Sequence, residues 1–301
     1  MVNGAVSVAK RLDVPPLVIG VVLVGFGTSV PELVTSIEAV LRGSEGIAVG
    51  NVLGSNIANV LLVAGAGALL IPVAKPTRGF TRDSLVLAVA TLMLIATAYA
   101  GSIDRIVGTM YLAVLGLYIA YMIVTERKSA KKRKAEKIDK GESFTIEKSV
   151  KSIPMGLLLS VIGIAMTVLG AKLLVEGAVD IARLFGVSET VIGVTIVAIG
   201  TSLPELATAV IAGVKGESDV SIGNIIGSNI YNILAILGAT ALVKPFSIDP
   251  SILKFDLWVM VFATILMIHV PVAFKGINRT MGGLFLAGYF AYLAAVYFMF
   301  V

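Results

Sequence analysis

The chain has 301 residues, of which 57% are apolar and only 14% are charged, and its mean hydropathy is +0.97. About a quarter of the residues of a soluble domain are charged, so the composition excludes an ordinary soluble protein. The net charge of +5 does not indicate nucleic-acid binding, because the basic residues gather in one short segment. A chain without cysteine has no disulfides, iron–sulfur clusters or thiolate zinc sites.

Apolar segments long enough to cross the hydrocarbon core of a bilayer recur along the chain. We expect nine membrane-spanning helices, at residues 14–41, 51–70, 85–100, 103–124, 153–181, 187–214, 221–243, 253–272 and 282–301. The sequence therefore predicts an all-α polytopic membrane protein, and we expect it in the plasma membrane.

The segment 126–152 separates the fourth of these helices from the fifth. Residues 126–151 include ten Lys or Arg against five Asp or Glu, and such a segment buries too little apolar surface to fold. Basic loops stay on the cytoplasmic side of a membrane, so we expect a cytoplasmic loop here. It divides the chain into two expected units, residues 1–125 and 153–301.

The two units carry a sequence repeat. Residues 2–59 align without a gap on residues 175–232, and 27 of the 58 pairs are identical. Chance similarity of apolar sequence would preserve Leu, Val and Ile, whereas this repeat also preserves Pro, Glu and Asn. With the basic loop inside, the two copies cross the membrane in opposite directions. The sequence therefore predicts two inverted-topology repeats, the plan of many secondary transporters, with a site where they meet near the midplane.

The first unit is one helix short of this plan. The second unit has five expected helices, and its first, residues 153–181, precedes most of the repeated segment. We therefore expect nine helices of a ten-helix plan whose first helix is missing. A start codon assigned too late, a truncated chain and a real nine-helix variant are the three explanations, and we favour the first two.

Polar residues recur at matched positions inside the apolar segments. Gly-Thr-Ser-x-Pro-Glu occurs at residues 27–32 and again at 200–205, so Glu32 and Glu205 lie at membrane depth. An ionisable residue there is costly without a partner and indicates a functional site. The alternative is that each carboxyl is protonated and has only a structural role. That alternative does not explain why both glutamates recur with the same Thr and Ser before them.

A second polar motif, Gly-Asn-x-x-Gly-Ser-Asn-x-x-Asn, occurs at residues 50–59 and 223–232. On a helix, Ser55 and Asn59 share a face, as do Ser228 and Asn232. Such side chains also hold membrane helices together, and that alternative stays open. The prolines of the first motif disturb the helix one turn back, so we expect loosened carbonyls near Gly25, Thr28, Ala198 and Thr201.

All of these candidate ligands are hard oxygens: carboxylates, hydroxyls, amides and carbonyls. Such a set suits sodium, calcium or magnesium and not zinc, copper or iron. Two carboxylates can neutralise one divalent ion or two monovalent ions. If the divalent and the monovalent ions compete for the same ligands, that competition is sufficient for exchange.

The paired motifs resemble the alpha repeats of sodium/calcium exchangers, in the calcium/cation antiporter superfamily. The resemblance implies side-chain ion ligands at Glu32, Thr28, Ser29 and Ser55, with Glu205, Thr201, Ser202 and Ser228 in the second repeat. It also implies carbonyl ligands at Gly25 and Ala198 and central amides at Asn59 and Asn232. Some relatives carry Asp where this chain has Asn232, and the lower charge argues against potassium co-transport.

The resemblance implies a secondary antiporter that exchanges Na⁺ for Ca²⁺ by alternating access. Proton-coupled relatives usually lack the Thr-Ser-x-Pro-Glu form, which favours sodium, but a proton-coupled Ca²⁺ antiporter and a cation channel stay open as alternatives. An enzyme is not expected, because the chain has no Ser–His or Asp pair of recognisable spacing and no His-based metal motif. We expect no cofactor. The expected partners are Ca²⁺, Na⁺ and the lipid bilayer, with no indication of an oligomeric state.

Some charged residues have simpler interpretations. Glu38 and Arg42, four residues apart, predict an ion pair at the membrane interface. Lys172, Glu176 and Asp180 predict a similar ladder, and His269 is expected near an interface and not in a proton relay.

Overall fold

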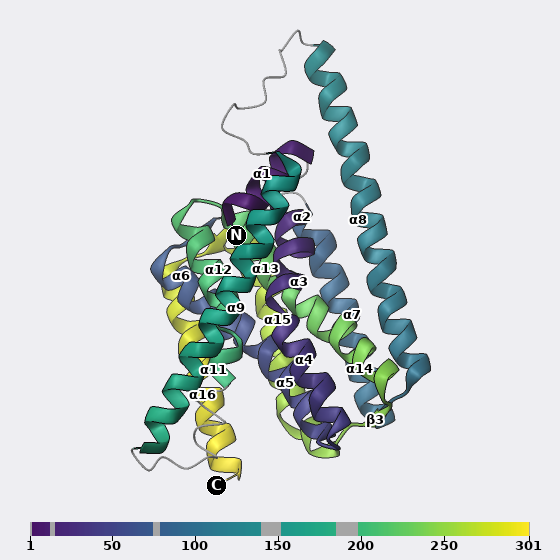
Figure 1. Ribbon diagram of the computed structural model, residues 1–301, viewed down its shortest axis with the longest axis vertical. Coiled ribbons are helices and arrows are strands. Elements are labelled where there is room, and N and C mark those ends of the chain that lie inside the picture. Colours follow the sequence, from purple (N-terminus) through teal and green to yellow (C-terminus); the bar gives the residue numbers. More distant parts are fainter. Residues whose placement is uncertain (1, 13–15, 75–78, 140–151, 185–197, 301) are drawn as a thin grey trace.

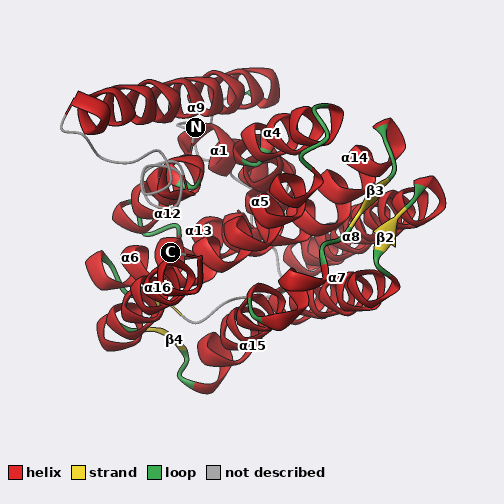
Figure 2. Ribbon diagram, turned by 90° about the horizontal axis from the view of Figure 1, so that it is seen from below, coloured by secondary structure: helices red, strands yellow, loops and turns green. Residues whose placement is uncertain are grey.

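The computed structural model describes residues 2–12, 16–74, 79–139, 152–184 and 198–300. Within these ranges the protein is a bundle of helices with four two-residue strands (Figures 1 and 2). The first half contains helices α1 (Val2–Leu12), α2 (Pro16–Ile19), η1 (Gly20–Gly25), α3 (Phe26–Thr28), α4 (Val30–Leu41), α5 (Glu45–Ala58), η2 (Asn59–Ala64), α6 (Gly65–Leu70), α7 (Phe80–Ala100) and α8 (Arg105–Asp139). The second half contains α9 (Ile153–Leu184), α11 (Ala198–Thr201), α12 (Leu203–Val214), α13 (Ser218–Tyr231), η4 (Asn232–Leu237), α14 (Gly238–Val243), η5 (Pro250–Lys254), α15 (Asp256–Ala273) and α16 (Arg279–Phe300).

The all-α membrane architecture agrees with the sequence. Among the described residues, seven helices are long and apolar enough to cross a membrane, or eight if one bent pair counts as a single span. The expected span at residues 187–214 lies partly outside the described residues, and its described part forms α11 and α12. The count of nine therefore stays a prediction.

Two long helices form the centre of the bundle. The spans Glu45–Leu70 and Ser218–Val243 are 78% and 83% buried, whereas the window of α9 is 11% buried. Figure 2 shows α9 at one edge of the bundle and α7 with α15 at the other. Each central span contains a short π-helix that begins at the last Asn of its motif, η2 at Asn59 and η4 at Asn232. Such π-segments are frequent at functional sites.

The expected single helix at residues 14–41 is wrong in detail. The chain bends by 47° between Gly20–Thr28 and Val30–Leu41, and Ser29 at the break has φ −87° and ψ 4°. Pro31 occupies the first turn of α4, where its missing N–H costs nothing. Ser202 has nearly the same conformation before α12, which Pro204 begins in the same way.

The expected start of the basic loop at Glu126 is also wrong. Helix α8 continues through this segment to Asp139, and Figure 1 shows its end projecting beyond the rest of the bundle. The Glu126 side chain is buried, and its Oε1 forms an ion pair with Nη1 of Arg82 at 2.9 Å. Arg82 also pairs with Asp83 at 2.6 Å, and the Tyr118 hydroxyl donates to Asp83. The sequence predicts a solvated loop from Glu126 onward, whereas this residue is the buried ion-pair partner of Arg82.

The four short strands connect the two halves. β1 (Val73–Ala74) pairs with β4 (Gly276–Ile277), and β2 (Ser102–Ile103) pairs with β3 (Phe246–Ser247), both antiparallel. Each pair joins one strand from each half. They hold together the ends of helices that the chain separates by more than 140 residues.

Candidate functional site

The two repeated proline motifs place their carboxylates at corresponding points of the fold. Glu32 lies in the first turn of α4 and Glu205 in the first turn of α12. The breaks at Ser29 and Ser202 set where α4 and α12 begin. Each glutamate therefore lies at a helix N-terminus, where a negative charge is favourable. Both glutamates are only 1% exposed.

The two glutamates are neighbours in the buried centre of the bundle. Oε2 of Glu32 and both carboxylate oxygens of Glu205 are buried without a hydrogen-bond partner. Two buried carboxylates of like charge repel each other and have lost their water, so a positive ion between them would relieve both costs. The chemistry of this donor set fits a cation as cargo.

Hydroxyl groups surround the Glu205 carboxylate. Those of Thr28, Ser29 and Ser228 lie near it, although neither carboxylate oxygen has a hydrogen-bond partner. Oγ1 of Thr28 lies 3.4 Å from Oγ of Ser228, and Ser228 donates to the Gly25 carbonyl at 3.3 Å. The sequence-predicted residues Thr28, Ser29, Gly25, Ser228 and Glu205 therefore lie together, although they come from both halves of the chain.

The expectation of a freed carbonyl at Gly25 needs correction. This carbonyl accepts from the Ser29 amide at 3.3 Å and from the Ser228 hydroxyl at 3.3 Å. The Thr28 hydroxyl oxygen lies 3.4 Å from it, farther than from the Val24 carbonyl at 3.1 Å. These contacts are longer than the usual 2.9 Å of such bonds. Its partners are therefore the Ser29 amide of its own helix and two hydroxyls of the candidate site, and a hydroxyl can rotate to another acceptor.

The matching residues of the other half are arranged differently. Ser55 and Thr201 line one cavity of about 210 Å³, together with Tyr289 and Tyr292 of α16. Oγ of Ser202 is buried without a partner. Ala198 begins α11, and the residues before it lie outside the described ranges.

The central amides meet where the two long spans cross. Nδ2 of Asn59 donates to Oδ1 of Asn229 at 3.0 Å. Both polar atoms of Asn232 are buried without a partner. Asn59 and Asn232 are therefore both buried, and Oδ1 of Asn59 and both polar atoms of Asn232 have no hydrogen-bond partner.

Sequence reasoning missed part of this network. Oδ1 of Asn224 accepts from Thr28 at 3.2 Å, and Asn51 donates to the Glu32 carbonyl at 3.1 Å. Asn229 and its repeat partner Asn56 are also buried. The helical spacing carried the signal for two of them, because Asn51, Ser55 and Asn59 lie four apart on one face, as do Asn224, Ser228 and Asn232.

Comparison with known proteins decides the family. The family model described as sodium/calcium exchanger protein matches residues 1–124 and 155–298. The chain belongs to the sodium/calcium exchanger family. The membership supports antiport of cations, with Ca²⁺ among them.

Individual members of the family resemble this chain over nearly its full length. The putative antiporter CaxA of Alkalimonas amylolytica is 37% identical over 97% of this chain and 91% of its own length. The sodium/calcium exchanger MaX1 of Methanosarcina acetivorans is 33% identical over 99% of this chain and 93% of its own. A solved structure of the sodium–calcium exchanger NCX_Mj, soaked with Na⁺ and Sr²⁺, superposes with a TM-score of 0.78 at 31% identity, covering 97% of this chain and 91% of that one.

Proposed function

We propose that this family member exchanges Na⁺ for Ca²⁺ by alternating access at the site between Glu32 and Glu205. The observation that carries the proposal is the pair of buried carboxylates, with unpartnered oxygens, in the first turns of two matched helices. One Ca²⁺ neutralises both charges, and so do two Na⁺ ions. Loading with one kind of ion excludes the other, because they need the same oxygens.

The proposed ligands are those implied by the two motifs. Hydroxyls and carbonyls complete the oxygen set that a hard cation requires. The set comprises Glu32, Glu205, Thr28, Thr201, Ser29, Ser202, Ser55, Ser228, Asn59, Asn232 and the carbonyls of Gly25 and Ala198.

The proposed mechanism rests on two inverted repeats, residues 1–125 and 153–301. Their contacts are reciprocal, which supports this division. Helix α6 packs on α16 while its repeat partner α14 packs on α8, and the strand pairs β1–β4 and β2–β3 follow the same rule. A site between two such halves can be opened to either side by moving a few helices.

The proposed orientation places the end of α8 and the segment after it in the cytoplasm. Ten basic residues between positions 126 and 151 support this by the positive-inside rule. We propose the plasma membrane as the location. In this orientation α7 begins on the cytoplasmic side, because its Arg82 contacts Glu126 of α8.

Two other transport modes give different results in one experiment. Purified protein is reconstituted in vesicles, and uptake of radioactive Ca²⁺ is measured with an outward Na⁺ gradient, a pH gradient, or neither. Na⁺-driven uptake supports the proposal, whereas uptake driven only by pH indicates proton coupling. A channel would release Ca²⁺ without any counter-ion on the far side.

Glu205→Gln is the decisive variant. We expect it to abolish Na⁺-driven Ca²⁺ uptake, because one of the two neutralising charges is lost. Asp104→Asn is the control, since Asp104 is an exposed acid whose Oδ1 accepts a hydrogen bond from the Val107 amide at the start of α8. Near-normal exchange by Glu205→Gln would overturn the proposal.

A further inference from the structure

Two hydrogen bonds occupy matching places in the two halves of the chain. Tyr118 of α8 donates to Oδ1 of Asp83, in the first turn of α7, at 2.9 Å. Tyr292 of α16 donates to Oδ1 of Asp256, in the first turn of α15, at 2.9 Å. Asp83 and Asp256 are separated by the offset of the sequence repeat. Neither carboxylate belongs to the set of ion ligands proposed above.

The two pairs differ in charge. Arg82 precedes Asp83 and forms an ion pair with it at 2.6 Å. Phe255 holds the corresponding place before Asp256, and its ring stacks on that of Tyr292 with the centroids 5.9 Å apart. Within the described part of the chain, Asp256 has no ion pair. A basic residue therefore neutralises the first carboxylate and not the second.

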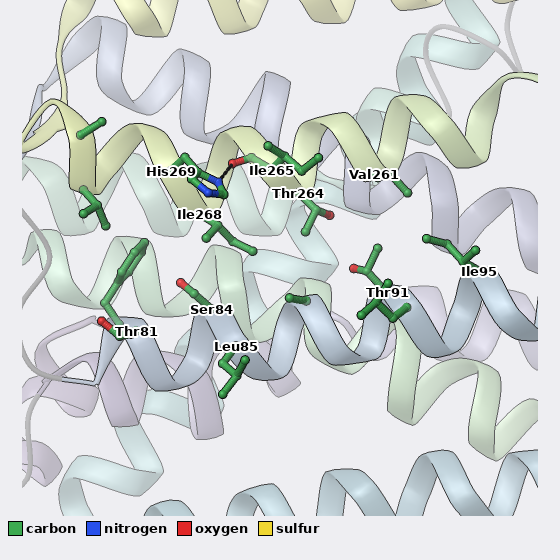
Figure 3. A pocket seen from close by; sticks show the side chains of 15 residues that line it. Thr81, Ser84, Leu85, Thr91, Ile95, Val261, Thr264, Ile265, Ile268 and His269 are labelled. Atoms are coloured by element: carbon green, nitrogen blue, oxygen red, sulfur yellow. Dashed lines mark hydrogen bonds between the residues drawn. The ribbon is translucent and has the colours of Figure 1, made fainter.

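Tyr292 lines a small cavity beside the proposed ion site, and not the wide groove between α7 and α15. That groove has a volume of about 680 Å³, and Figure 3 shows Val261 and Ile265 on its α15 wall. No carboxylate is among its described lining residues, so it offers little to a cation. The cavity that Tyr292 lines has a volume of about 210 Å³ and also contains Ser55 and Thr201.

This cavity runs from one end of the bundle toward its centre. Along α5 its lining passes from Gly50 to Ser55, which lies farther from the start of the helix. Along α16 it passes from Val296, near the end of the helix, to Tyr292. Strand β3 contacts Glu45 at the start of α5 and pairs with β2, which follows the end of α7. In the orientation proposed above, the cavity therefore extends from the extracellular side.

Tyr292 can offer its oxygen to a cation. Its hydroxyl donates to Asp256, so the lone pairs of the phenol oxygen remain for other partners. The carboxylate polarises this oxygen, since linked hydrogen-bonding groups in a protein strengthen one another. Phenol and carboxylate are hard oxygen donors, which suit Ca²⁺. A site with one carboxylate leaves the ion most of its waters and holds it weakly, which suits a stop on the way to stronger ligands.

We propose that Asp256 and Tyr292 form an outer binding site for a hydrated Ca²⁺ ion, in the cavity that leads to the proposed ion site. The negative charge raises the concentration of cations at the extracellular mouth. On the cytoplasmic side Arg82 cancels the charge of the matching pair, so no such site forms there. The direction of this effect rests on the proposed function, whereas the binding of a cation does not require transport.

The test uses Tb³⁺, which replaces Ca²⁺ at oxygen sites and emits when a nearby tyrosine or tryptophan is excited. The purified full-length protein carries Glu205→Gln, which removes one carboxylate of the central site. We expect saturable emission that Ca²⁺ displaces and that Asp256→Asn, added to Glu205→Gln, lowers at least about fivefold. Asp104→Asn in the same background is the control, since Asp104 is an exposed acid that follows β2 at the same end of the bundle. Equal emission with and without Asp256→Asn would overturn the proposal.

A second pair of variants keeps the carboxylate. Phe255→Arg copies the arrangement of Arg82 beside Asp83 and should lower the emission as much as Asp256→Asn does. Phe255→Leu removes the ring without adding a charge and should retain most of the emission. Size-exclusion profiles establish that each variant is folded. Full emission from a folded Phe255→Arg variant would overturn the proposal.

Transport gives an independent readout. In protein with an intact central site, Asp256→Asn should raise the extracellular Ca²⁺ concentration for half-maximal Na⁺-driven uptake about fivefold at low ionic strength. The maximal rate and the half-saturating concentration on the cytoplasmic side should not change. A shift of equal size on both sides would overturn the proposal. If the parent protein lacks Na⁺-driven uptake but Asp256→Asn still lowers Tb³⁺ emission, the proposed function fails and the outer site stands.

Discussion

Nδ2 of Asn59 donates a hydrogen bond of 3.0 Å to Oδ1 of Asn229, across 170 residues of chain. Both side chains are buried, at the crossing of the two central spans. The contact joins one repeat to the other directly beside the candidate ion site. It is asymmetric, because Asn56 and Asn232, the repeat partners of these residues, have buried amides without partners.

The first prediction concerns this bond. Asn59→Ala and Asn229→Ala should each weaken apparent Ca²⁺ affinity about tenfold, the effect of losing one partner of a buried hydrogen bond. The double variant should lose little more Ca²⁺ affinity than either single variant, since each of the three variants removes the same hydrogen bond. Ca²⁺-dependent initial uptake rates measure the affinities. Additive effects would mean that the two amides act independently.

A second prediction separates the Thr28 hydroxyl from its methyl group. Oγ1 of Thr28 lies 3.2 Å from Asn224 Oδ1 and 3.4 Å from Ser228 Oγ, and it lies near Glu205. Thr28→Val should therefore reduce exchange at least about tenfold, and Thr28→Ser should retain most of it. Thr167→Val is the control, because Thr167 of α9 donates only to the Gly163 carbonyl of its own helix. Equal activities of Thr28→Val and Thr28→Ser would exclude a role for the hydroxyl.

The third prediction concerns stability at the start of α7. Arg82 lies between Asp83 and Glu126, and its side chain is only 15% exposed. Arg82→Met should lower the free energy of unfolding by about 3 kcal/mol, because two buried carboxylates lose their counter-charge. A thermal-unfolding midpoint several degrees lower would be the measured result.

Arg42→Met provides the control for that variant. Arg42 pairs with Glu38 at 3.6 Å, as the sequence predicts, but the two side chains are 78% and 59% exposed. Such surface pairs contribute little, so the midpoint should not change. If Arg82→Met behaves like Arg42→Met, the buried cluster does not stabilise the fold.

The fourth prediction tests how closely the helices approach at the site. A Cβ atom at Gly227 would lie 2.8 Å from Cα of Val21 and 2.9 Å from its carbonyl oxygen. The backbone of η1 would have to move away, so Gly227→Ala should cost about 1–3 kcal/mol of stability and reduce exchange. Gly116→Ala on α8 should be neutral or stabilising, because no described atom lies within 4 Å of the added Cβ. Thermal-unfolding midpoints and Ca²⁺ uptake rates are measured for both variants. Unchanged values for Gly227→Ala would show that η1 can move away without loss of stability or exchange.

The sequence by itself determined the predominantly helical membrane architecture and the family, and it led to the ion ligands that we propose. Hydrophobic length predicts membrane helices whatever their neighbours, since the bilayer imposes it. The recurrence of Glu, Pro, Ser and Asn at a fixed offset predicts which residues occupy matched positions in the two repeats. The family resemblance follows from the same motifs, and the comparisons confirm it.

Only the tertiary structure decided which groups meet across the repeats. Helical spacing places Thr28 and Glu32 on one face, but it does not predict that Thr28 contacts Ser228 or that Asn59 contacts Asn229. Nor could composition show that Glu126, at the start of a basic run, is buried against Arg82. Periodicity describes one helix at a time, whereas these contacts depend on how two helices cross. That crossing is set by the close approach of small residues such as Gly227 to a distant backbone.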